Sequence, residues 1–256
     1  PLSRALAEMS HTYRFDSIGD TRSTQEREAL QMMASNFEGS PFSTLEKILN
    51  FPLYVPRQNL TTFLVKYEIM KRLLNVHGSI VECGVGFGGG LFTWAQLSAI
   101  LEPTNHQRRV IGFDSFAGFP SVSEHDKGSY VGELAIDSEA ELKKCALAYD
   151  LNRFVGHIPK IELVRGDITD TVPDYLLSHQ HLVVSLLYID CDIYEPTGAA
   201  LDFLLPRMPK GAIVAFDELN LAAWPGETMA VAEHFGLDQL KLERCAFGST
   251  ISWGVL

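Results

Sequence analysis

The sequence lacks the features that mark several specialised classes of protein. Its 256 residues contain no apolar run of 18 or more, so we expect no membrane-spanning helix. No signal peptide is visible. The four cysteines lie far apart and form no C-x-x-C pair, which argues against a structural zinc site or a disulfide framework. These absences predict a protein of the reducing cytoplasm.

Positive charge is also scarce, because 21 Lys and Arg residues stand against 32 Asp and Glu residues, a formal net charge of −11. Nucleic-acid backbones and anionic membranes attract a surplus of Lys and Arg, so neither is expected as the main partner. The length suits one large domain or at most two small ones. Because the chain begins at Pro1 and ends within the apolar run Ile251–Leu256, one expectation is that it is a domain of a longer protein.

The amino-terminal part of the chain carries no strand pattern. Apolar residues recur at helical spacing in Thr24–Ala34 and Leu60–Leu74, which predicts a helix in each range. Between them, Phe51–Pro56 is predicted to be extended, because its two prolines disfavour a helix. We therefore expect residues 1–77 to form a helical segment that serves as a lid, and residues 78–256 to form the main domain.

From Ser79 onward, short apolar runs alternate with helical segments. This alternation predicts an open, doubly wound α/β sheet of the Rossmann-like type, mostly parallel. Two closing runs, Gln239–Cys245 and Thr250–Leu256, are expected to form a terminal antiparallel pair. The other predicted strands are Ile80–Cys83, Val110–Asp114, Ile161–Val164, Leu182–Asp190 and Ala212–Asp217, and the predicted helices are Leu91–Leu101, Glu139–Leu147, Pro196–Leu205 and Thr228–Phe235.

An acidic residue lies at the carboxyl end of each of the first five predicted strands, or just beyond it. Open sheets of this kind bind ligands outside the carboxyl ends of their strands. Surface acids that serve only solvation would fall at both ends of the sheet, so the pattern predicts a binding edge. The acids are Glu82, Asp114, Asp167, Asp190 with Asp192, and Asp217 with Glu218.

The stretch Gly84–Gly89 follows the first strand and matches G-x-G-x-x-G, which is a weak signal by itself. It suits a dinucleotide or another ligand that needs close backbone approach, and it equally describes a tight turn without a ligand. Glu82 would repel a pyrophosphate and attract the ammonium group of an amino-acid moiety. Asp114 could accept from a ribose diol and Asp167 from an adenine amino group, or each could only stabilise a turn.

The acids after the fourth and fifth strands form a second group. If these strands are neighbours, Asp190 converges with Asp217 and Glu218, and clustered carboxylates are unfavourable unless they share a cation. Oxygen ligands of this kind suit Mg²⁺ or Ca²⁺. The alternative is that Asp190 and Asp217 cap helices and hold no metal.

Two further residues are candidates for acid–base chemistry. Asp192 could act as a base, or it could cap the helix that begins near Pro196. His125 lies in the long loop Ser115–Ser138, a candidate lid, where an imidazole could transfer a proton or have no function.

Four motifs, in this order, resemble the macrocin O-methyltransferase family: Val81–Val85, Gly112–Pro120, Ile189–Thr197 and Phe216–Glu218. The second and third, D-S-F-x-G-x-P and D-x-D-x-Y-x-x-T, are fairly specific, whereas the glycine loop is not. The resemblance covers roughly the range from Leu60 to Phe235.

The resemblance implies a class I methyltransferase sheet, bound S-adenosylmethionine, a divalent metal that is usually Mg²⁺, and a homo-oligomer. It implies that Asp190, Asp217 and Glu218 hold the metal, with Glu218 where the family commonly has a second Asp. By position, the residues that would hold the cofactor are Glu82, Gly84, Gly86, Asp114, Ser115 and Asp167.

We therefore expect methyl transfer from S-adenosylmethionine to a hydroxyl of a small natural product, such as a sugar or a polyketide. Asp190, Asp192 or His125 would accept the hydroxyl proton. Two alternatives stay open. An NAD-dependent oxidoreductase would share the glycine loop and Asp114, but it leaves the acids of the fourth and fifth strands unexplained. A catalytically silent methyltransferase-like domain of a biosynthetic megaenzyme would show no turnover.

Overall fold

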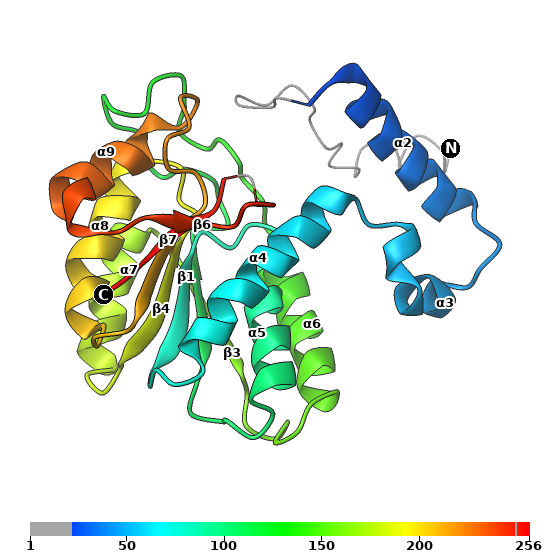
Figure 1. Cartoon of the computed structure of the whole chain (residues 1–256), viewed down its shortest axis with the longest axis horizontal. Coiled ribbons are helices and arrows are strands. Elements are labelled where there is room, and N and C mark those ends of the chain that lie inside the picture. Colours follow the sequence, from blue (N-terminus) through cyan, green and yellow to red (C-terminus); the bar gives the residue numbers. More distant parts are fainter. Residues whose placement is uncertain (1–21, 249) are drawn as a thin grey trace. The chain divides into compact units, whose positions relative to one another are not determined.

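The computed structural model describes residues 22–248 and 250–256 (Figure 1). The chain divides into two compact units between Arg57 and Gln58. Helix α4 (Arg57–Leu73), part of the predicted amino-terminal segment, contributes Val65 and Ile69 to the core of the second unit. In the described ranges, no helix is both long and apolar enough to cross a membrane.

Two helices and one 3₁₀ turn make up the described part of the first unit. Helices α2 (Thr24–Gly39) and α3 (Thr44–Leu49) each begin with a capping box, in which a Ser and a Glu three residues later exchange hydrogen bonds. The prediction that Phe51–Pro56 is extended is wrong at its start, because Phe51–Leu53 forms the 3₁₀ turn η1. Pro52 lies in the first turn of that helix, where its missing N–H group is tolerated.

The described residues of the second unit form one seven-stranded sheet in the order β3-β2-β1-β4-β5-β7-β6. Strands β1 to β5 pair in parallel, and β7 is antiparallel to both β5 and β6. The predicted α/β fold is therefore confirmed, including its terminal antiparallel pair. The strands are β1 (Ser79–Cys83), β2 (Val110–Asp114), β3 (Ile161–Arg165), β4 (Val184–Ile189), β5 (Ile213–Phe216), β6 (Glu243–Arg244) and β7 (Ser252–Val255).

Helices cover both faces of this sheet (Figure 1). Side chains of α4, α5 and α6 share one apolar core with residues such as Ile80 and Tyr188, and those of α7, α8 and α9 share a second with Val81 and Ile189. Alternate residues of a strand point to opposite faces, so β1 and β4 are buried on both sides. The helices are α5 (Gly89–Leu101), α6 (Glu139–Leu151), α7 (Ile168–Ser178), α8 (Tyr194–Leu204) and α9 (Pro225–His234), with 3₁₀ turns η2 (Leu205–Arg207) and η3 (Leu237–Gln239).

One buried arginine joins four elements at the amino end of the sheet. Arg108 is 3% exposed and precedes β2. Because its guanidinium group satisfies carbonyls that end α4 and begin β1, it fixes how helix and sheet meet. It donates to the carbonyl oxygens of Leu73 (3.0 Å), Val76 (2.9 Å) and Gly78 (2.8 Å), to the Glu102 carboxylate (2.6 Å) and to the Ser185 hydroxyl (2.5 Å).

Replacing Arg108 with Met should lower the free energy of unfolding by about 3–5 kcal/mol, because Glu102 and the carbonyl groups would stay buried without their donor. Arg109→Met is the matched control. Arg109 makes one ion pair, with Glu162 at 3.2 Å, and its side chain is 36% exposed. Arg109→Met should lower the free energy of unfolding by less than about 1 kcal/mol. Urea denaturation measures both variants, and equal losses would show that Arg108 has no special structural role.

Candidate functional site

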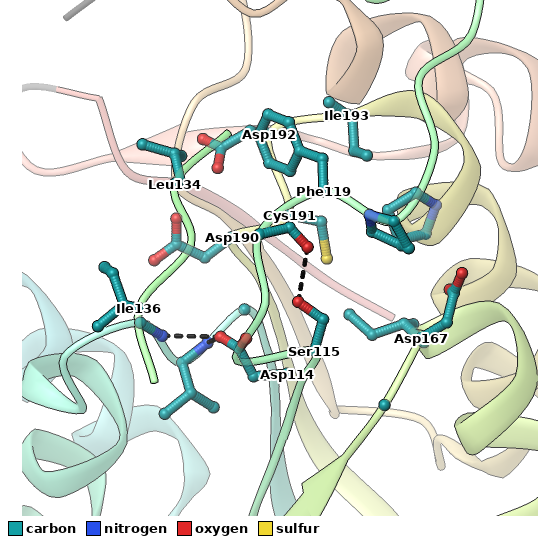
Figure 2. Close-up of a pocket in the computed structure, with 18 of the residues that line it drawn as sticks. Asp114, Ser115, Phe119, Leu134, Ile136, Asp167, Asp190, Cys191, Asp192 and Ile193 are labelled. Atoms are coloured by element: carbon teal, nitrogen blue, oxygen red, sulfur yellow. Dashed lines mark hydrogen bonds between the residues drawn. The ribbon is translucent and has the colours of Figure 1, made fainter. Parts of the chain in front are cut away.

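A cavity of about 360 Å³ opens at the carboxyl ends of strands β1 to β4 (Figure 2). It lies beside β1, where the strand order reverses, and open sheets bind their ligands at that point. Most of its wall comes from the segments that directly follow the strands, as the row of acids predicts. The lining includes Gly84–Phe87, Asp114, Ser115, Gly118–Pro120, Leu134, Ile136, Gly166–Ile168, Asp190–Ile193 and Pro196.

The glycine loop forms the turn from β1 into α5. Gly84 has φ +89°, a left-handed conformation that favours glycine. A Cβ atom at Gly84 would lie 1.8 Å from the carbonyl oxygen of Asp190. The backbone N–H of Asp190 in turn donates to the carbonyl of Cys83 at 2.8 Å. Gly84 is therefore required because the two central strands touch backbone to backbone where the cavity begins.

Asp114 organises this loop through its carboxylate. Its Oδ2 atom accepts hydrogen bonds from the backbone N–H groups of Val85 (2.7 Å) and Gly86 (2.8 Å) (Figure 2). Its Oδ1 atom accepts one from the backbone N–H group of Phe116 at 2.6 Å. A carboxylate can accept about four hydrogen bonds, so one site stays free on Oδ1. Asp114 can thus hold the loop and still accept from a ligand hydroxyl in the cavity.

Asp167 and Ser115, two of the predicted cofactor residues, also line the cavity, and each also makes hydrogen bonds within the protein. Asp167 caps helix α7, because its Oδ1 atom accepts from the backbone N–H of Thr169 at 2.9 Å and from the hydroxyl of the same residue at 2.8 Å. The Ser115 hydroxyl donates to the Gly118 carbonyl at 2.6 Å. Asp167 keeps its second carboxylate oxygen for a ligand, whereas Ser115 mainly shapes the loop.

Glu82 lies outside the cavity lining and is 1% exposed. Its Oε2 atom accepts from the Lys66 ammonium group at 3.3 Å and from the Trp94 indole N–H at 2.8 Å. Burial raises the pKa of the Glu82 carboxyl, and the Lys66 charge opposes this shift. A contact between Glu82 and the ammonium group of a ligand stays a prediction. In the structure, the ammonium group of Lys66 already contacts this carboxylate.

The acids that follow β4 and β5 are crowded together, so burial and the charges of their neighbours shift their pKa values. Burial first, and the Asp217 charge second, raise the pKa of Asp190 well above its usual range. Burial and the charge of Asp190 do the same for Asp192, and burial raises the pKa of Glu218 to about 7. Both Asp190 and Asp192 line the cavity, and Figure 2 draws Asp167 on the opposite side of it.

Two residues that are not among the predicted site residues complete this cluster. Glu227, in the first turn of α9, is 0% exposed, and its Oε1 atom accepts from the backbone N–H of Glu218 at 3.2 Å. Burial and then the charge of Asp217 raise the pKa of Glu227 well above its usual range. Tyr188 donates its hydroxyl to the Asp217 carboxylate from within β4. Neither residue lies directly after a strand, where the sequence pattern predicts the binding residues.

The donor set fits a hard divalent cation by its chemistry. In the part of the chain that the structure describes, no three acidic, histidine or cysteine side chains gather closely enough to hold a metal ion as they stand. The available donors are nevertheless all oxygens, which Mg²⁺ and Ca²⁺ prefer. The Oε2 atoms of Glu218 and Glu227 are buried without a hydrogen-bond partner. Buried, unpaired carboxylate oxygens of like charge are stabilised by a shared cation.

His125 does not line the cavity. Its ring lies against that of Tyr194, with 4.4 Å between the centroids, and the Tyr194 hydroxyl donates to Glu233 on α9 at 2.6 Å. The structure thus places His125 of the long loop against Tyr194 of α8, outside the lining of the cavity. The acid–base function of His125 stays a prediction.

Comparison with known proteins identifies similar chains. The family model described as Macrocin-O-methyltransferase (TylF) matches residues 61–242. The tetracenomycin 4'-O-methyltransferase of Streptomyces olivaceus, which is named for a 2,3-dimethoxy-α-L-rhamnosyl substrate, is 30% identical over 160 residues, or 58% of this chain and 55% of that protein. This chain thus spans about half the length of the curated relatives it matches.

Two solved structures of one protein are similar over nearly the whole chain. The structure described as CalS11, a calicheamicin methyltransferase, superposes with a TM-score of 0.90 at 36% identity, covering 96% of this chain and 99% of that one. The structure described as the apo form of CalS11, a TDP-rhamnose 3'-O-methyltransferase, gives a TM-score of 0.81 at 36% identity, covering 91% and 95%. The class I methyltransferase sheet is therefore confirmed.

Proposed function

The chain belongs to the macrocin O-methyltransferase family, and we propose on this basis that it transfers the methyl group of S-adenosylmethionine to a hydroxyl of a small natural product. The observation that carries the proposal is the cavity beside β1, where the glycine loop meets the acids that follow β4. A cationic sulfonium placed there meets negative charge, and the glycine loop allows close approach of the cofactor to the backbone.

The cofactor would be held by residues on the glycine-loop side of the cavity. Asp114 keeps one acceptor site for a ribose hydroxyl, and the second carboxylate oxygen of Asp167 can accept from the adenine amino group. Ile136 and Ile168 add an apolar wall that suits a flat base. This arrangement leaves the opposite wall, with Asp190 and Asp192, for the methyl group and the acceptor.

The acceptor we propose is a deoxysugar hydroxyl. The names of two similar proteins include rhamnose in different settings, as TDP-rhamnose for CalS11 and as a rhamnosyl group on tetracenomycin for the Streptomyces olivaceus enzyme. The chemistry shared by these two substrates is a sugar hydroxyl, whereas the group attached to the sugar differs. For this chain we therefore propose only the sugar hydroxyl as acceptor, and we propose nothing about the group attached to the sugar.

Methyl transfer is an in-line displacement. The acceptor oxygen attacks the methyl carbon, the bond from carbon to sulfur breaks, and the products are a methyl ether, S-adenosylhomocysteine and a proton. The walls of the cavity must hold the two reacting atoms about 3–3.5 Å apart. A carboxylate oxygen of Asp192 would take the proton, because burial and the charge of Asp190 raise its pKa and so strengthen it as a base.

A divalent cation, which the family resemblance implies, would be held by Asp190, Asp217 and Glu218, and it would lower the pKa of the acceptor hydroxyl. The charge of Asp217 raises the pKa of both Asp190 and Glu218, and a shared cation would relieve that repulsion. Tyr188 supports this by orienting Asp217, since burial raises the pKa of its hydroxyl and keeps it protonated. The homo-oligomer and the cytoplasmic location stay predictions.

Calorimetry with S-adenosylmethionine tests the proposal first, and we expect saturable binding. Turnover is then assayed with nucleotide-linked and aglycone-linked deoxysugars, with and without EDTA, followed by addition of Mg²⁺. Absence of cofactor binding would end the methyltransferase proposal, and NADH titration would then test the oxidoreductase alternative. Binding without turnover on any acceptor favours the silent domain. Turnover that EDTA does not reduce would exclude the metal ion from the proposed mechanism and would leave the proposal of methyl transfer intact.

A further inference from the structure

Asp126 connects the long loop Ser115–Ser138 to helix α8 through a buried carboxylate. It is 4% exposed although it lies in a polar loop. Its Oδ2 atom accepts from the backbone N–H of Ser123 at 2.7 Å and from the hydroxyl of the same residue at 2.6 Å. Its Oδ1 atom accepts from the backbone N–H of Tyr194, the first residue of α8, at 2.8 Å. A carboxylate 68 positions earlier in the chain thus serves the start of this helix.

Helix α8 has no cap of its own. Its N-cap residue is Ile193, whose side chain cannot accept a hydrogen bond. The residue before it, Asp192, has φ +63°, and it lines the cavity. The sequence alternative in which Asp192 caps this helix is therefore not what the structure shows. Asp126 occupies the capping position instead, and it also places a negative charge at the positive end of the helix.

Three segments of the site meet at this carboxylate. A Cβ atom at Gly226, in the first turn of α9, would lie 1.9 Å from Asp126 Oδ1 and 2.7 Å from the Tyr194 nitrogen. A small apolar cluster lies beside it, formed by Phe119 of the loop, Ile193 before α8 and Trp224 before α9. The rings of Phe119 and Trp224 meet edge to face at 5.9 Å. The position of Asp126 is thus fixed by packing from all three segments.

We propose that Asp126 is a positioning residue for Asp192, and that it acts by capping α8 from the loop so that the Asp192 carboxylate faces the cavity. The proposal rests on the proposed function, in which Asp192 accepts the acceptor proton. Without Asp126, the N–H group of Tyr194 would lack its partner, and the start of α8 would fray together with Asp192, which lies two residues before Tyr194. The base would then leave the cavity.

The test compares three single variants. Asp126→Ala removes the cap, and Asp126→Asn keeps an amide oxygen that can accept from the Tyr194 N–H group. Ser121→Ala is the matched control, because Ser121 also joins the loop to α8, by donating to Glu195 at 2.5 Å, but it does not touch the helix start. We expect Asp126→Ala to lower kcat on the order of 10–100-fold, with the Kd of S-adenosylmethionine changed less than about 2-fold. Asp126→Asn should restore most of kcat, and Ser121→Ala should leave it unchanged.

A double-mutant cycle shows whether Asp126 acts through Asp192. In an Asp192→Ala background, the further change Asp126→Ala should have little effect on kcat, because the base is already gone. Additive losses would overturn the proposal, as would a wild-type kcat in Asp126→Ala. A parallel fall of kcat, cofactor affinity and Tm that Asn does not rescue would show a purely structural role.

Hydrogen exchange of the peptide that spans residues 190–197 gives a readout that needs no turnover. Exchange at the Tyr194 amide should rise in Asp126→Ala, but not in Ser121→Ala. If the wild-type protein fails to methylate any acceptor, the proposed function fails. Exchange still decides the positioning role in that case, because unchanged exchange in Asp126→Ala would overturn it.

Discussion

Replacing Asp190 with Asn should lower kcat by about 10²–10³-fold and, in the same protein, raise its thermal stability. The two effects share one cause. Burial removes much of the hydration of Asp190, and the charge of Asp217 crowds it, whereas the charge of Lys66 opposes only part of this effect. Its negative charge is unfavourable in the folded protein, and it is useful only when a cationic ligand is bound. The Asn side chain has nearly the same shape without the charge.

The pH dependence of stability follows from the direction of the pKa shift. A carboxyl whose pKa is raised on folding binds its proton more tightly in the folded state, so stability falls as the pH rises above the ordinary pKa of Asp. Asp190→Asn has no carboxyl at this position, so its stability does not undergo this fall with rising pH. The difference in Tm between variant and wild type should therefore be small near pH 4 and should widen toward pH 7.

Thermal scans of EDTA-treated protein across this range measure the stability effect, and calorimetry checks that S-adenosylmethionine still binds. Asp174→Asn is the control, since Asp174 lies on the exposed side of α7. It should change neither Tm nor kcat. If Asp190→Asn is less stable than the wild type at pH 7, the charge-crowding explanation is contradicted. If Asp190→Asn keeps full activity, Asp190 has no role in catalysis.

Replacing Gly84 with Ala should destabilise the protein by about 3–5 kcal/mol and abolish cofactor binding. The added Cβ atom would lie 1.8 Å from the carbonyl oxygen of Asp190, and φ at this position is +89°. The clash is with backbone, so no side-chain rotation relieves it. The carboxyl ends of β1 and β4 must separate, and the walls of the cavity separate with them.

Two neighbouring glycines serve as graded controls for this prediction. Gly86 has φ +52° with open space around its Cβ position, so Gly86→Ala should cost only about 1–2 kcal/mol of backbone strain. Gly89 has open space and no positive φ, so Gly89→Ala should leave the Tm unchanged or slightly higher. Urea denaturation ranks the three variants. A loss at Gly84 no larger than that at Gly86 would contradict the contact between the strands.

The sheet could be predicted from sequence because its pattern is local. Each of β1 to β5 is a short apolar run, and the acids that follow them mark the binding edge without any knowledge of packing. Helix α7 was not predicted, because Pro173 interrupts its pattern. In the structure, Asp167 caps this helix, and Val172 and Leu176 bury their side chains in the core, which offsets the unfavourable proline.

The direction in which each acid points could not be predicted, because it depends on partners far away in the chain. Glu82 and Asp190 both stand at strand ends, yet Glu82 faces Lys66 in the preceding helix and Asp190 faces the cavity. Asp192 precedes a helix and should cap it by local rules, but Asp126 takes that position from a loop. Sequence spacing carries no information on such long-range pairs.

The small apolar cluster of Phe119, Ile193 and Trp224 has a consequence for engineering this enzyme. Attempts to retarget a catalyst toward new acceptors often exchange one surface loop at a time. Here a foreign loop in place of residues 115–138 would leave Ile193 and Trp224 without their packing partner. Chimeras that transplant the loop together with the segments leading into α8 and α9, as one cassette, should fold more often than chimeras that exchange the loop alone.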